Sequence, residues 1–188
     1  MLTGARRALR AYRPRPVAVE PGMIPAAVAI ALCDGDDGLE ALFIHRAERA
    51  DDTWSGQIAF PGGRRDPGDA DLLATAIRET REEVGVDLSR AERLGVLDDM
   101  HPRTPVLPPV VVRPIVFGLR ARPPITLSAE VQDAFWASFR ALSAPGVLRE
   151  ITIHHRGVYR VLPAYVLGDR TIWGMTERIL TPLLQLVF

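Results

Sequence analysis

The sequence predicts an α+β layered sandwich that forms one main domain. Its 188 residues are enough for one domain with a sizeable core. Hydrophobic residues make up 47% of the chain and occur in short runs, which indicates a globular fold rather than disorder. Strand patterns are mixed with a few helical patterns, and no repeat or linker separates them. We expect residues 1–22 to form an N-terminal extension and residues 23–188 to form the domain.

Strands are expected where apolar runs are bounded by turn residues. Ala26–Cys33 is a near-continuous apolar run, which indicates a buried strand. The turn-rich residues 34–38 would join it to a hairpin partner. Pro114 interrupts a later run and predicts a sheet edge or a bulge there. The expected strands are Ala26–Cys33, Leu39–His45, Gln57–Phe60, Arg93–Leu97, Val110–Leu119, Val147–His154 and Val158–Leu167.

Helices are expected at both ends of the chain and in its middle. Residues 2–12 predict a short basic helix, which the prolines that follow would end. Part of Val131–Leu142 is expected to form a second helix. Met175–Val187 has apolar residues at helical spacing, and we expect Pro182 to distort or split that helix.

The most informative segment is Gly62–Val86, which reads GGRRDPGDADLLATAIRETREEVGV. It predicts a glycine turn followed by a helix, which Asp69 or Asp71 can cap and Gly85 can end. One side of this helix is apolar and is expected to face the core. The other side carries a dense group of charges near the helix end.

Glu79, Glu82 and Glu83 fall within about 100° of one another on the helical wheel. Carboxylates at this spacing repel one another, and the negative end of the helix dipole disfavours them further. Because a divalent cation would reverse both penalties, the cluster predicts a metal site. Arg78 reaches Glu82 at i+4 and can orient it, while Arg81 points elsewhere. The alternative, a solvated charged face, does not explain why acids crowd the unfavourable helix end.

This segment resembles the signature of the Nudix pyrophosphohydrolases: Gly, five residues, Glu, seven residues, then Arg-Glu-apolar-x-Glu-Glu-x-Gly-apolar. The RETREEVGV run from Arg78 to Val86 matches its second half, except that Thr80 replaces an apolar residue, and Gly63 matches the first glycine. Asp69 stands where the first Glu is expected, and eight residues rather than seven separate it from Arg78. The resemblance implies a Nudix-type α/β/α sandwich with a mixed central sheet and the Nudix-box helix.

Further segments resemble the coenzyme A pyrophosphatase branch of this family. FPGG at 60–63, DPGD at 66–69 and RET at 78–80 follow its pattern. LFIHR at 42–46, SGQ at 55–57 and IWGMT at 172–176 lie where the branch has related segments. The match is incomplete, because His45 replaces a Thr and a second Arg of the pattern has only Arg49 nearby.

The resemblance implies a magnesium-dependent enzyme that splits a diphosphate bond, with Mn²⁺ as the alternative ion. Magnesium prefers a few carboxylates together with waters and substrate oxygens. The implied metal ligands are the Gly63 carbonyl, Glu79, Glu82 and Glu83. The implied catalytic residues are Glu79, Glu82 and Arg78, and the expected phosphate contacts are Arg46, Arg49 and Arg64.

Other residues could complete the site from outside the helix. Asp98, Asp99 and Glu130 are candidates for an additional acid, although such residues are more often plain turn or strand-end residues. Trp54 lies close enough to the box in sequence to contact a base. The loop 100–109, with His101 and Arg103, could form a specificity wall.

Three functions fit these observations. The first is hydrolysis of coenzyme A or an acyl derivative to 4′-phosphopantetheine and 3′,5′-ADP. The second keeps the chemistry but takes nucleoside di- or triphosphates or nucleotide sugars. The third is a ligand-binding regulator that kept the fold and lost catalysis, and the intact Glu79, Glu82 and Glu83 argue against it.

Composition excludes several other classes. The formal net charge is zero, which argues against binding to nucleic acid polymers or to membranes. All 23 basic residues are arginine, so Schiff-base and lysine-base chemistry are excluded and phosphate contacts must be arginine forks. The lone Cys33 allows no internal disulfide and is expected to be buried. No apolar run approaches the ~20 residues of a membrane span. We expect a cytoplasmic protein with a small-molecule diphosphate substrate, and a homodimer is left open.

Overall fold

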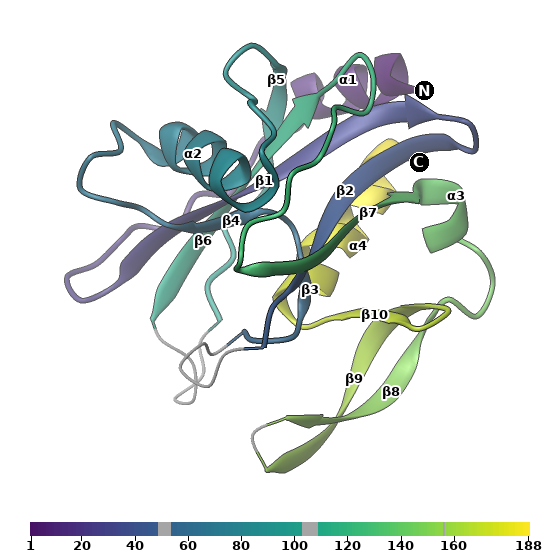
Figure 1. Cartoon of the computed structure of the whole chain (residues 1–188). Coiled ribbons are helices and arrows are strands. Elements are labelled where there is room, and N and C mark those ends of the chain that lie inside the picture. Colours follow the sequence, from purple (N-terminus) through teal and green to yellow (C-terminus); the bar gives the residue numbers. More distant parts are fainter. Residues whose placement is uncertain (49–53, 103–108, 156) are drawn as a thin grey trace.

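A mixed seven-stranded sheet forms the centre of the protein (Figure 1). The structure is a computed structural model and describes residues 1–48, 54–102, 109–155 and 157–188. The strand order is β3-β2-β1-β6-β5, with β4 paired to β1 and β7 paired to β2. β1 runs parallel to β6 and antiparallel to β2 and β4. The strands are β1 (Ile24–Gly35), β2 (Gly38–Arg46), β3 (Ile58–Ala59), β4 (Gly62–Arg64), β5 (Glu92–Val96), β6 (Val110–Gly118) and β7 (Val131–Ser138).

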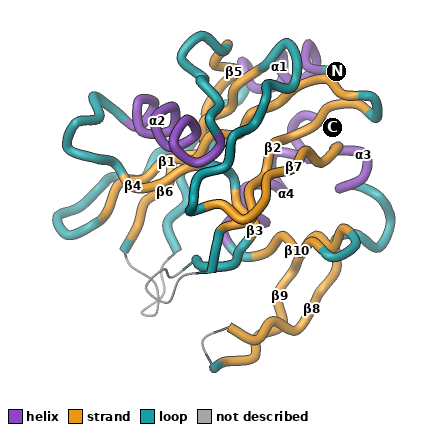
Figure 2. Tube along the Cα trace, viewed as in Figure 1, coloured by secondary structure: helices purple, strands orange, loops and turns teal. Residues whose placement is uncertain are grey.

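Helices cover both faces of this sheet (Figures 1 and 2). The box helix α2 (Leu72–Val84) lies on one face, where its buried residues share a core with β1, β2 and β6. Helices α1 (Leu2–Ala11) and α4 (Met175–Val187) lie on the other face and share a second core with the same sheet. The predicted α/β/α sandwich with a mixed central sheet is therefore confirmed.

The first strand separates the two cores by simple alternation. Ala29 and Ala31 belong to the core under α2, whereas Ile30 and Leu32 belong to the core under α1 and α4. Successive side chains of a strand point to opposite faces, so a strand that is covered on both faces must be apolar throughout. This is why the predicted run from residue 26 to residue 33 is uninterrupted.

A smaller three-stranded sheet extends from the main body (Figure 1). It consists of β8 (Leu148–His155), β9 (Val158–Leu167) and β10 (Arg170–Trp173), in the order β10-β9-β8. The short helix α3 (Phe139–Leu142) connects the main sheet to it. The predicted pair of strands at 147–154 and 158–167 is confirmed with small shifts, while β10 was not predicted.

The expected helix within Val131–Leu142 is confined to the last four residues of that range. Residues 131–138 form β7, which pairs with β2 from Glu40 to Arg46, and only residues 139–142 are helical. The pattern VQDAFWASFRAL fits a helix locally, but pairing to a buried strand decides its conformation. The expected glycine turn at 62–63 likewise forms part of the short strand β4, which pairs with β1.

Two proline expectations need correction. Pro114 lies in β6, which has neighbours on both sides, so the sheet-edge prediction is wrong. The nearby register shift lies in β5, between Arg93 and Gly95, rather than at the proline. The Leu97 N–H donates to the Pro114 carbonyl just beyond the end of β5, where the missing proline N–H breaks no ladder bond. Pro182 does not split α4, which runs continuously to Val187.

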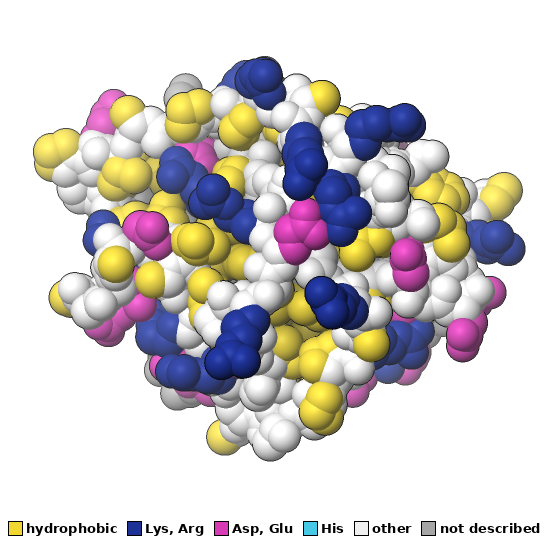
Figure 3. All heavy atoms as spheres, turned by 90° about the horizontal axis from the view of Figure 1, so that it is seen from above, with side chains coloured by type: hydrophobic (Ala, Val, Ile, Leu, Met, Phe, Trp, Pro, Cys, Tyr) yellow, Lys and Arg dark blue, Asp and Glu magenta, His cyan; other side chains and the backbone are white. Residues whose placement is uncertain are grey.

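The predicted N-terminal helix is confirmed as α1. Its Ala5 and Leu9 are buried in the core that α4 also lines, and Arg6 forms an ion pair with Glu92 through its Nε and Nη2 atoms. Figure 3 looks down on this end of the molecule, where arginine side chains are scattered among hydrophobic and uncharged groups. The division into an extension at 1–22 and a domain at 23–188 stays a prediction. No helix in the described part of the chain is long and apolar enough to cross a membrane.

Candidate functional site

The box helix is fixed at both ends by its own sequence. The Asp71 carboxylate accepts the Ala74 N–H at 2.8 Å and caps the N-terminus, so Asp71 rather than Asp69 is the cap. Gly85 ends the helix in the left-handed conformation with φ of 72°, which favours glycine. These two ends set which helix residues face β4.

Arg78 organises the acidic face of α2. Its guanidinium forms a fork with Asp69, with distances of 3.0 Å from Nε to Oδ1 and 2.9 Å from Nη2 to Oδ2. Nη1 donates to Glu79 and to Glu82, each at 2.9 Å, so the predicted Arg78–Glu82 contact is present. Nη2 also donates to the Arg64 carbonyl of β4 at 3.1 Å. One side chain thus ties the helix, the preceding loop and β4 together.

Asp69 is the anchor of this arginine. Its carboxylate is buried and also accepts the Thr75 hydroxyl and the Asp66 N–H, each at 2.9 Å. The hydrogen bonds from Arg78 hold the pKa of Asp69 well below its usual range despite the opposing effect of burial. Asp69 therefore stays charged. It stands where the Nudix pattern has its first Glu, and in this structure its carboxylate holds Arg78.

Glu83 is the most deeply buried acid of the helix, with 3% of its surface exposed. It accepts the Gly62 N–H at 2.8 Å and the Arg46 Nη1 at 3.3 Å. Burial raises the pKa of Glu83 to about 8, and the charges of Glu79 and Glu130 add to the rise. Burial also raises the pKa of Glu79. Both carboxylates would gain from a nearby positive charge.

The two glycines of β4 allow the strand to approach its neighbours closely. A Cβ on Gly62, whose φ is 153°, would clash with the Ala27 carbonyl and lie 2.6 Å from the Val28 Cα. A Cβ on Gly63 would lie 2.5 Å from the Glu79 Oε1. The backbone of β4 therefore lies directly against β1 on one side and the acidic helix face on the other.

These residues border a cavity of about 410 Å³ between the sheet, α2 and the start of α4. Its lining includes both charged and apolar side chains. The charged part consists of Arg46, Arg64, Glu79, Glu83 and Glu130, with Gln57. The apolar part comprises Ala26, Ala27, Val28, Trp54, Ala59, Phe60, Val110, Val112, Met175 and Ile179, and Gly62, Gly63 and Thr176 complete the lining. A ligand with one anionic and one organic half would match this division.

The predicted metal ligands are only partly brought together. Gly63, Glu79 and Glu83 line the cavity, whereas Glu82 is half-exposed beside Arg78. Among the described residues, no three Asp, Glu, His or Cys side chains are already gathered as a metal cluster. The donor set nevertheless fits a hard divalent cation, because two carboxylates and a backbone segment border one cavity and burial disfavours the charge of both acids.

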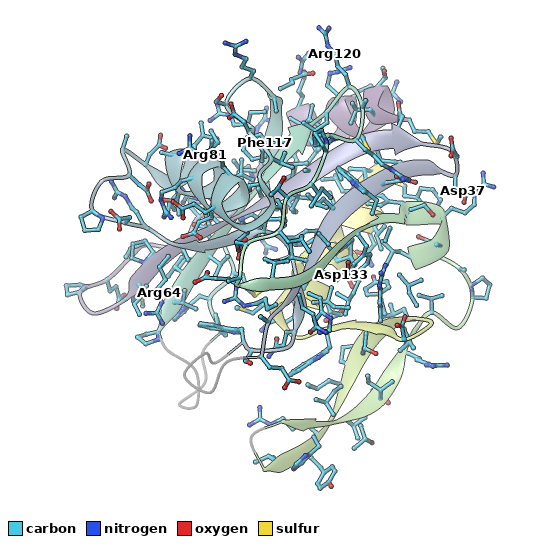
Figure 4. The ribbon with its side chains drawn as sticks, in the orientation of Figure 1. Asp37, Arg64, Arg81, Phe117, Arg120 and Asp133 are labelled. Carbon is cyan, nitrogen blue, oxygen red and sulfur yellow. The ribbon has the colours of Figure 1, made fainter. Side chains whose placement is uncertain are left out.

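Two of the three predicted phosphate-binding arginines lie at the cavity. Arg46 and Arg64 line it, and Figure 4 shows Arg64 on the side of the sheet where β4 ends. Arg49 lies outside the described residues, as does Arg103 of the predicted specificity loop. Arg81 projects from the outer side of α2, away from the sheet (Figure 4).

Only some of the acids and aromatic residues expected from outside the helix lie at the cavity. Glu130 and Trp54 line the cavity. Asp98 and Asp99 do not, because Asp98 binds Tyr12 and Arg15, and Asp99 binds Arg113.

The sequence reasoning did not assign the α4 residues of the lining to the site. Met175 and Thr176 are part of the IWGMT segment, which matched the branch pattern and could have indicated them, and Ile179 follows it.

The chain is similar to known proteins in both sequence and structure. A family model described as the NUDIX domain matches residues 23–162. Human mitochondrial coenzyme A diphosphatase NUDT8 is 32% identical over 193 residues, covering 100% of this chain and 75% of that protein. The mouse protein of the same name is 29% identical over 164 residues, covering 86% and 77%. The Nudix hydrolase NudL of Photorhabdus laumondii is 31% identical over 135 residues, covering 71% and 70%.

Solved structures show the same fold. A MutT/nudix family protein from Enterococcus faecalis superposes with a TM-score of 0.58 at 23% identity, over 89% of this chain and 62% of that chain. The match therefore spans less than two thirds of the Enterococcus protein. The box helix α2, the contacts of Arg78 and the two glycines of β4 are all in place. The family match over most of the chain shows that this protein belongs to the Nudix hydrolases, a family of pyrophosphohydrolases.

Proposed function

We propose that this enzyme hydrolyses the diphosphate bond of coenzyme A or of an acyl-coenzyme A. Water would add to one phosphorus, the bridging P–O bond would break, and the products would be 4′-phosphopantetheine (or its acyl form) and 3′,5′-ADP. The observation that carries this proposal is the cavity, whose lining combines the buried carboxylates Glu79 and Glu83 with a large number of apolar side chains. The identity to coenzyme A diphosphatases along the whole chain supports the choice of substrate.

The site residues would hold a Mg²⁺ ion, with Mn²⁺ as the alternative. Glu79, Glu83 and the Gly63 carbonyl are the proposed ligands, and Glu82 is a further ligand or orients water. When bound, such an ion neutralises phosphate charge and makes water a better nucleophile. The fit rests on two carboxylates and the Gly63 backbone bordering one cavity, where burial raises the pKa of both acids even though each has an arginine partner.

The arginines would divide two tasks between them. Arg78 has five hydrogen bonds to protein groups, so it positions Glu79 and Glu82 rather than meeting substrate. Arg46 and Arg64 border the cavity and would contact phosphate oxygens. Arg46 also holds Glu83, so it would link phosphate binding to the most buried acid.

The apolar part of the wall would receive an organic part of the substrate. Trp54 lies before β3, Met175 and Ile179 belong to α4, and all three line the same cavity. Such a surface excludes water from the diphosphate and adds binding energy without further charge. We also propose that the enzyme acts in the cytoplasm, and its oligomeric state stays a prediction.

The test is a turnover assay with Mg²⁺ on coenzyme A, octanoyl-coenzyme A, ADP-ribose, nucleoside triphosphates and a nucleotide sugar, with products identified by mass spectrometry. The proposal requires the highest kcat/KM on a coenzyme A substrate and 4′-phosphopantetheine or its acyl form among the products. Faster turnover of a nucleotide or nucleotide sugar would identify that compound, rather than coenzyme A, as the substrate. A starting protein that turns over none of them would indicate a ligand-binding regulator instead.

Matched variants connect the activity to the cavity. Glu83→Gln keeps the size of the side chain and removes its charge, so activity should fall by at least about 10²-fold. Glu150→Gln makes the same change on the exposed strand β8 and should leave activity unchanged. Equal activity of the two variants would show that the reaction does not use this cavity.

A further inference from the structure

Residues 12–17, which we call the N-terminal segment, lie along residues 97–100 just after β5. The Arg15 N–H donates to the Asp98 Oδ1 at 2.9 Å, and the Asp99 N–H donates to the Arg15 carbonyl at 3.1 Å. The Tyr12 hydroxyl and the Arg15 Nε donate to Asp98 at 2.7 and 2.6 Å. The N-terminal segment is therefore held by main-chain and side-chain bonds together.

Asp99 connects this segment to the central sheet. Only 2% of its side chain is exposed. Its carboxylate accepts the Val17 N–H at 2.9 Å and a fork from Arg113 of β6, with distances of 2.9 Å from Nε and 2.8 Å from Nη2. A buried carboxylate with a forked partner has a narrow range of allowed positions, so movement of Val17 is transmitted to β6.

The same strand supplies part of the apolar cavity wall. Met100 and Val112 exchange two backbone hydrogen bonds of 2.8 Å, one in each direction. Val110 and Val112 form a hydrophobic cluster with Ala26, against which Met100, Trp54 and Met175 pack. Val110 and Val112 also line the cavity. The contacts that run from Val17 through Asp99 to Arg113 thus end next to Val112, which lines the cavity.

We propose that the N-terminal segment is a positioning element of the active site, which acts through Asp99 and Arg113 to place the apolar wall of the cavity formed by β6. Its role would be to set the affinity for the organic part of the substrate. For its kinetic readout this inference rests on the proposed function. None of the segment's residues contacts Glu79 or Glu83 among the interactions of the described residues.

The acidic part of the wall is supported independently. Glu79 is held by Arg78, and Glu83 by Gly62 and Arg46. Those hydrogen bonds come from Arg78 of α2, Arg46 of β2 and Gly62 of β4, and the strands β2 and β4 pair with β1 rather than with β6. Loss of the contact at Val17 should therefore weaken substrate binding and leave the chemical step intact, which predicts an effect on KM with kcat unchanged.

The decisive variant is Val17→Pro in the full chain, because proline removes the backbone N–H by which the N-terminal segment donates to the Asp99 carboxylate. Val17→Ala is the matched control, since it shortens the same side chain and keeps the N–H. Val19→Pro controls for backbone stiffening at an exposed residue whose N–H has no hydrogen bond within the described residues. Tyr12→Phe, which removes only the hydroxyl bond to Asp98, is a milder variant should Val17→Pro not fold.

Two measurements decide the outcome. Steady-state kinetics on the best diphosphate substrate should show KM raised about three- to tenfold in Val17→Pro, with kcat within about twofold of the starting protein. Tyr12→Phe should show a smaller rise in KM with kcat likewise unchanged. Hydrogen exchange of the Met100 and Val112 amides should be faster in both variants than in the two controls.

Hydrogen exchange needs no substrate, so it tests the inference even if coenzyme A is not hydrolysed and the proposed function fails. Unchanged KM with unchanged exchange would overturn the inference. So would a fall in kcat without a change in KM, because the segment would then act on the acidic part of the wall. Equal effects of Val17→Ala and Val17→Pro would also overturn it, because the N–H would not be the group that matters.

Discussion

The Glu83 carboxylate of the box helix accepts the backbone N–H of Gly62 at 2.8 Å. This bond joins the last turn of α2 to β4 and places a buried acid beside the cavity. It depends on a main-chain conformation that only glycine adopts easily, since φ at Gly62 is 153°. The acid and the glycine therefore form one structural unit, although 20 residues of loop and helix lie between them.

Gly62→Ala tests this unit. The new methyl group would clash with the Ala27 carbonyl and force β4 away from β1, which also strains the bond to Glu83. We expect unfolding in urea to show a loss of about 2–4 kcal/mol together with loss of activity. Gly4→Ala adds the same methyl group in α1 with nothing within 4 Å and should cause no loss of stability. Equal stability of the two variants would contradict the predicted clash.

Arg78→Lys tests the set of hydrogen bonds that Arg78 makes to Asp69, Glu79, Glu82 and the Arg64 carbonyl. Lysine cannot form the fork with Asp69 while also reaching Glu79, Glu82 and the Arg64 carbonyl. We expect kcat to fall at least about tenfold and stability to fall by about 1–3 kcal/mol. Arg81→Lys makes the same change on the outer side of α2 and should stay within about 0.5 kcal/mol of the starting protein. Full activity of Arg78→Lys would show that a positive charge alone is sufficient.

Glu130 supplies a carboxylate to the cavity from outside the box helix, just before β7. Its charge raises the pKa of both Glu79 and Glu83, although by less than burial does. We expect Glu130→Gln to lower kcat/KM at least about tenfold, because one of three carboxylates that attract a cation is lost. Glu130→Asp keeps the charge and should retain most activity. If Glu130→Asp were inactive and Glu130→Gln active, the size of the side chain at position 130, rather than its charge, would be what activity requires.

Cys33 gives a prediction about pH. It is fully buried in β1, and burial together with the charge of Glu40 raises the pKa of its thiol to about 11. The unfolded value is about 8.5, so the folded state favours the neutral thiol. The stability that this preference contributes is complete below about pH 8.5 and is lost as pH rises towards 11.

Two measurements check this thiol. A disulfide reagent at pH 8 should not react with the folded protein and should titrate one thiol in guanidinium. The free energy of unfolding should decline more steeply above about pH 9 in the starting protein than in Cys33→Ala. Rapid labelling of the folded protein would contradict the buried position.

Much of the site could be predicted because its residues lie in one continuous segment. Arg78, Glu79, Glu82 and Glu83 occupy one helix, so their relative placement follows from helical geometry. The fork from Asp69 to Arg78 could not be deduced from periodicity, because it depends on how the loop folds back. The cavity lining from Met175 and Ile179 was missed for a similar reason, since α4 meets β4 only in the folded chain.

The failed fold predictions have a common physical cause. Residues 131–138 contain Phe135 and Ala137, which suit either a helix face or a half-buried strand, and pairing with β2 makes the choice. Gly62 and Gly63 show no strand pattern in the sequence, yet they pair with β1 as part of β4. Pro114 is tolerated inside the sheet because its missing donor faces a position where β5 has already ended. Each outcome depends on partners distant in sequence.

The parallel pairing of β1 with β6 also constrains how the chain folds during synthesis. Ile24 pairs with Val110, and the loop that this contact closes contains β2 to β5 and the entire box helix. Non-local pairing of this kind is slow to form because a long chain must be ordered first. The emerging polypeptide therefore leaves the ribosome with the apolar edge of β1 uncovered until β6 follows, and this interval is when a chaperone would be most needed.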